Sequence, residues 1–135
     1  MKMLNRVWGH KSAKRGVVAS IFVILVLTVL EFPKPVGFET RSQSNVSHAW
    51  LILFFAILIS EILALVIVHR RAKRGARLAI IAGFLNIVQI IADQTHMMQP
   101  QVPSRTYSLL EYAVGLASLA LIYFSLGVLG YLRKL

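Results

Sequence analysis

The sequence predicts an all-α protein, a bundle of four transmembrane helices with both termini in the cytoplasm. Of the 135 residues, 57% are hydrophobic and 15% are charged, whereas charged residues make up about 25% of soluble proteins. The mean hydropathy is +0.70. Because one span takes about 20 apolar residues, the chain has room for four spans with short connections. We therefore expect a single membrane domain and exclude a water-soluble enzyme fold.

The first predicted span covers residues 16–32. It follows several basic residues, as the apolar part of a signal peptide would, but Thr28-Val-Leu-Glu-Phe-Pro33 stands where cleavage requires small residues. We therefore predict a retained span. Residues 33–47 contain two prolines, a glycine and many small polar residues, which is typical of a loop.

Two further spans are predicted over residues 48–68 and 78–98. The short segment between them, residues 69–77, holds five Lys and Arg residues and one glycine, and so short a connection predicts an antiparallel helical hairpin. A loop with two prolines follows, and the fourth span covers residues 109–132.

The basic residues are distributed unevenly along the chain. Of the 15 Lys and Arg residues, five precede the first span, five lie in residues 69–77 and two follow the fourth span. The positive-inside rule therefore places both termini in the cytoplasm. This topology, with attraction to anionic lipid headgroups on the cytoplasmic side, accounts for the net charge of +10 without nucleic acid as a partner. We expect the cytoplasmic membrane of a bacterium or archaeon.

The chain has no cysteine. This excludes disulfides, thiolate metal sites, Fe–S clusters and c-type haem attachment. A metal would have to be held by histidine, carboxylate or carbonyl ligands.

Most of the acidic residues fall within the spans or at their ends. An ionisable side chain at membrane depth costs at least about 2.5–3.5 kcal/mol on insertion scales, so each needs a partner, water or a neutral protonated form. Only Glu39 is plainly in a loop. The five acidic residues are Glu31, Glu39, Glu61, Asp93 and Glu111.

The third span carries a polar stripe. Its members, spaced by three, four and three residues, share one face of a helix, which we expect to turn toward the interior of the bundle. The two amides, Asn86 and Gln89, either form hydrogen bonds between helices or contact a ligand. For Asp93 and His96, contact with a ligand is favoured. The stripe comprises Asn86, Gln89, Asp93 and His96.

Glu61 lies 13 residues after the start of the second span, near the middle of the bilayer. The same count back from the end of the third span reaches Leu85 and Asn86, so Glu61 and Asn86 are expected at one level in antiparallel helices. We predict a hydrogen bond between them. Two roles remain open for Glu61. It carries protons or binds a polar group of a ligand, or it is protonated and has a structural role as a hydrogen-bond donor.

A second group of polar residues is predicted at the outer ends of the spans, where Glu31, Asp93, His96 and Glu111 converge. Asp93, His96 and Glu111 suit a hard or borderline cation. Hydrogen bonding and proton exchange with a quinone or lipid headgroup, and acid–base catalysis on a lipid, are alternatives. Four aromatic residues near the span ends predict an interfacial belt: Trp8, Trp50, Tyr107 and Tyr131.

From Glu61 through Arg70-Arg71-Ala-Lys-Arg74 to Asp93-Gln-Thr-His96, the pattern resembles small DoxX-like membrane proteins. These have four helices, an acid in the middle of the second helix and a short basic turn after it. The resemblance covers about residues 50–98. It implies a quinone-linked or accessory role in a membrane redox complex, with Glu61 as the functional residue.

The chain is also similar to small multidrug transporters, which have four short helices and an essential glutamate. That glutamate lies in their first helix, whereas Glu61 lies in the second span. We therefore expect an accessory or ligand-binding subunit with an outward-opening polar cavity for a quinone, lipid or cation, not an enzyme on its own. Other membrane subunits or copies of this chain are the expected partners. A proton-coupled transporter or a lipid-modifying enzyme is the alternative.

Overall fold

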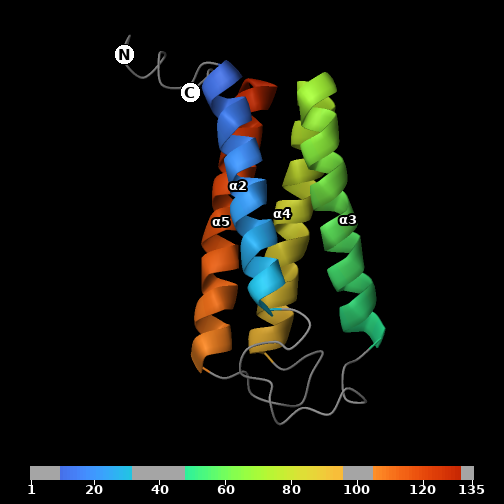
Figure 1. Ribbon diagram of the computed structural model, residues 1–135, viewed down its shortest axis with the longest axis vertical. Helices are drawn as coiled ribbons and strands as arrows, with labels where there is room; N and C mark the ends of the chain where they lie inside the picture. Colours follow the sequence, from blue (N-terminus) through green and yellow to red (C-terminus); the bar gives the residue numbers. More distant parts are fainter. Residues whose placement is uncertain (1–9, 32–47, 96–104, 132–135) are drawn as a thin grey trace.

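The computed structural model describes residues 10–31, 48–95 and 105–131, and these ranges are helical almost throughout. They form four helices, each long and apolar enough to cross a membrane. The predicted all-helical architecture with four candidate spans is therefore confirmed (Figure 1). The helices are α2 (His10–Glu31), α3 (His48–Arg70), α4 (Ala72–Gln94) and α5 (Arg105–Leu129).

The helices run alternately up and down the bundle (Figure 1). α3 packs along α4, α4 along α5, and α5 along α2, whereas α2 and α3 make few contacts with each other. The start of α2, the turn between α3 and α4 and the end of α5 lie at one end of the bundle. Most of the described basic residues therefore gather at this end, which we call the basic end.

The turn between α3 and α4 is much shorter than predicted. Residues 69–77 were expected to form the connection, but only Arg71, with φ −136° and ψ 78°, stands between the two helices. Alanine, lysine and arginine after Arg71 favour helix, and Gly75 lets the two helices meet closely. A Cβ atom at Gly75 would lie 2.5 Å from the Val68 backbone.

The outer helices also differ from their predicted bounds. α2 begins at His10, before the predicted start at residue 16, because the Lys, Ala and Arg residues that precede the apolar run are themselves helix formers. α5 ends at Leu129, before residue 132. Gly130 follows with φ +85°, the left-handed conformation in which glycine commonly ends a helix.

Small residues form much of the buried face of α4, and large apolar side chains cover the outside of the bundle. The buried face of α4 includes Gly75, Ala76, Ala79, Ala82 and Gly83. By contrast Val29, Ile52 and Leu116 are each at least 70% exposed. An apolar surface of this extent is typical of helices that face lipid.

Candidate functional site

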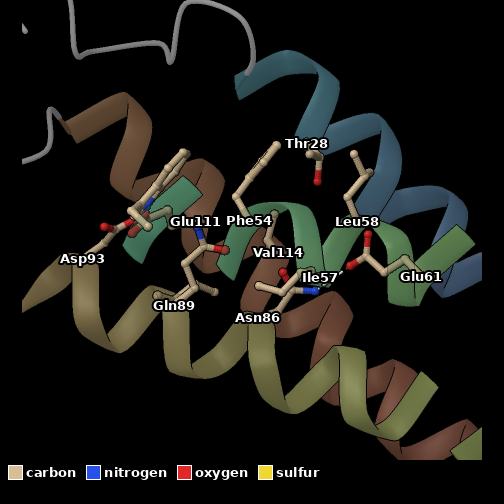
Figure 2. A pocket seen from close by; sticks show the side chains of 12 residues that line it. Thr28, Phe54, Ile57, Leu58, Glu61, Asn86, Gln89, Asp93, Glu111 and Val114 are labelled. Carbon is tan, nitrogen blue, oxygen red and sulfur yellow. Dashed lines mark hydrogen bonds between the residues drawn. The ribbon is translucent and has the colours of Figure 1, made fainter. Parts of the chain in front are cut away.

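A polar cavity lies between the helices (Figure 2), and all four contribute to its wall. Its volume is about 30 Å³, and a buried water needs roughly 10–15 Å³ measured in this way. The cavity thus has room for water, but it is far smaller than the roughly 300–1,000 Å³ of pockets for organic ligands. Its lining comprises Thr28, Trp50, Phe54, Ile57, Leu58, Glu61, Asn86, Gln89, Ile90, Asp93, Glu111 and Val114.

Glu61 and Asn86 form the deepest polar pair of the cavity. The Glu61 side chain on α3 is only 1% exposed, and the Nδ2 group of Asn86 on α4 donates a hydrogen bond of 2.6 Å to its Oε1. The predicted bond between these residues is confirmed. Oε2 of Glu61 is also buried, and it has no hydrogen-bond partner among the described residues.

Asp93 and Trp50 form a second pair, nearer the end where α3 begins. The indole Nε1 of Trp50 donates a hydrogen bond of 3.1 Å to Oδ2 of Asp93, and the indole stacks on Phe54 with the ring centroids 5.2 Å apart. Oδ1 of Asp93 is buried without a hydrogen-bond partner among the described residues. Trp50 was expected in an interfacial belt, which stays a prediction; its side chain is 7% exposed and bonds to Asp93 inside the bundle.

Glu111 on α5 brings a third carboxyl group to the cavity. It is 3% exposed, and Nε2 of Gln94 at the end of α4 donates a hydrogen bond of 2.6 Å to its Oε2. The same amide lies 3.3 Å from the hydroxyl of Ser108. Gln94 was not expected to take part, although it lies one residue beyond Asp93 and points to the next helix.

No protein-family model, curated protein or solved structure matches the chain. The DoxX-like resemblance therefore stays a prediction. Among the side chains that the structure describes, three acids and no Lys, Arg or His line the cavity.

Most of the predicted site residues lie around this single cavity. Asn86 and Gln89 share it with the three acids Glu61, Asp93 and Glu111, so the deep group and the outer group of the sequence prediction form one site. His96 lies outside the described residues, and so does the side chain of Glu31.

The predicted metal site is not formed by the described residues alone. Within residues 10–31, 48–95 and 105–131, no group of three or more His, Asp or Glu side chains is gathered closely enough to hold a metal ion. The set predicted from the sequence, Asp93, His96 and Glu111, includes one residue outside these ranges, so the metal stays a prediction.

Proposed function

We propose that the chain is a small multi-pass membrane protein that holds and exchanges protons at its polar cavity, and that it serves as a ligand-binding or accessory subunit. One observation carries the proposal: Oε2 of Glu61 and Oδ1 of Asp93 are buried carboxyl oxygens without a partner among the described residues, and both residues line one cavity. A buried carboxylate without compensating partners is costly, and a bound proton removes most of that cost.

The dimensions of the cavity favour protons and water over larger ligands. A volume of about 30 Å³ admits neither a quinone ring nor a lipid headgroup. Among the described residues, no basic side chain lines the cavity to neutralise ionised acids. Water in the cavity would link the carboxyl groups of Glu61, Asp93 and Glu111. The headgroup of a quinone or lipid would then exchange protons with these three carboxyl groups at the end of the bundle where α3 begins.

The proposal also includes an orientation. With the basic end in the cytoplasm, as the positive-inside rule predicts, Asp93 lies on the outer side of Glu61. Protons would therefore pass between the outer ligand and the deep carboxyl group through Asp93. The small cavity argues against enclosed substrates of the kind that a multidrug transporter carries.

Hydrogen–deuterium exchange followed by infrared spectroscopy tests the proposal, because water fits the cavity. In membranes that contain the intact protein at neutral pH, we expect the C=O band of the protonated Glu61 carboxyl group to shift to lower frequency after transfer to heavy water. The shift would show that the buried proton exchanges with water. Glu61→Gln should lack the shifting band. If no carboxylic acid band assigned to Glu61 or Asp93 shifts in the folded protein, the proposal is refuted.

A further inference from the structure

A second, larger hollow lies at the basic end of the bundle, between the start of α2 and the end of α3. Its volume is about 400 Å³, within the roughly 300–1,000 Å³ range of ligand pockets. Among the described residues, none that lines it is acidic. We call this hollow the basic groove; it is lined by Lys11, Lys14, Arg15, Val18, Ala19 and His69.

One of the three cations of the basic groove is bonded to the neighbouring helix. Nζ of Lys14 donates a hydrogen bond of 3.3 Å to the backbone carbonyl of His69, which ties α2 to the last turn of α3. An ammonium group has three donors, so Lys14 keeps donors for a ligand. Lys11 and Arg15 are exposed beside it. The groove thus offers three cations to one anionic group.

The surface of α2 turns from basic to apolar along the line of the groove. Residues at spacings of three or four share one helix face, so Phe22 and Val26 continue the face that carries Lys11, Arg15 and Val18. Phe22 is 55% exposed and Val26 is 58% exposed. Since α2 and α3 make few contacts, an apolar chain can lie along this side of α2, below the cations.

We infer that the basic groove binds an anionic phospholipid, with its phosphate at Lys11, Lys14 and Arg15 and an acyl chain along the apolar face of α2. Along α2 the cations are followed by an apolar face, as the phosphate of a phospholipid is followed by its acyl chains. Basic pockets between transmembrane helices are known to bind phosphate headgroups. This inference requires the protein to lie in a membrane, but it is independent of proton exchange at Glu61.

Native mass spectrometry of the purified full chain in detergent tests the inference. Phosphatidylglycerol and phosphatidylcholine with identical acyl chains are added in parallel, and the bound fraction is measured. We expect phosphatidylglycerol to bind at least about tenfold more tightly. The triple variant Lys11→Gln, Lys14→Gln, Arg15→Gln should lose about a hundredfold in affinity, from about 1 kcal/mol per basic residue.

A matched variant separates the groove from general charge. The control is a second triple variant, Lys73→Gln, Arg74→Gln, Arg77→Gln. It removes three exposed cations at the same end that do not line the groove, and it should change the affinity for phosphatidylglycerol by less than about threefold. Ala19→Trp fills the groove without altering charge, and it should weaken binding even if the first triple variant fails to fold. Equal losses in the two triple variants, unaltered binding by Ala19→Trp, or displacement of the lipid by an equal concentration of inorganic phosphate would each overturn the inference.

Discussion

Replacing Gly75 with alanine is expected to lower the free energy of unfolding by about 2 kcal/mol, the middle of the range for overpacked sites. The new Cβ atom would lie 2.5 Å from both the backbone N and the Cα of Val68. These are backbone atoms on the other side of the tight turn at Arg71, so no side-chain rotation relieves the contact. α3 and α4 would have to separate, and the wall of the polar cavity that they share would move with them.

A second glycine provides the control for Gly75. At Gly115 on α5 a Cβ atom would approach only Cδ1 of Ile90, at 3.4 Å, which is an ordinary contact. Because alanine is the better helix former by roughly 0.5–1 kcal/mol, Gly115→Ala should be neutral or stabilising. Both variants are compared with the wild type by reversible unfolding in detergent. Equal effects of the two substitutions would contradict the close approach of α3 and α4.

Replacing Asn86 with leucine is expected to destabilise the protein by about 1.5 kcal/mol, near the upper end of measured hydrogen bonds between membrane helices. The substitution removes the amide that donates to Oε1 of Glu61 and leaves both oxygens of a buried carboxyl group without a donor. In a Glu61→Leu background the same change should cost much less, because the partner is already gone. The double-mutant cycle should yield a coupling of about 1 kcal/mol.

Gln89 offers a matched control for this cycle. It is a second buried amide on α4 that lines the same cavity, yet the described bond to Glu61 comes from Asn86. Gln89→Leu should therefore show no coupling to Glu61→Leu. If the coupling of Asn86 to Glu61 is also zero, the hydrogen bond at the centre of the site contributes nothing to stability.

The arrangement of the helices and the level of the deep pair were predictable from the sequence. Apolar runs of span length predict helices, and a short connection makes neighbouring helices antiparallel. Counting residues from the ends of two such helices then places Glu61 opposite Asn86. The count relies on the constant rise of a helix, and it reached the right pair although α4 ends at Gln94 and not at residue 98.

The partners of the other two acids were not predictable. Trp50 lies at the end of a span, where tryptophan is common at the interface, and only the packing of α3 against α4 turns its indole N–H toward Asp93. Gln94 likewise reaches Glu111 only because α4 and α5 lie side by side. The short turn at Arg71 was missed because basic residues indicate a membrane boundary, whereas their helix propensity continues the helix past it.

Infrared difference spectroscopy of the protein in membranes at neutral pH tests the central claim most directly. The claim is that the buried carboxyl group of Glu61 carries a proton. The spectrum of the wild type minus that of Glu61→Gln should contain the C=O stretching band of an un-ionised carboxylic acid. A difference spectrum that instead contains the two stretching bands of an ionised carboxylate would contradict it, and with it the proposal that the cavity holds and exchanges protons.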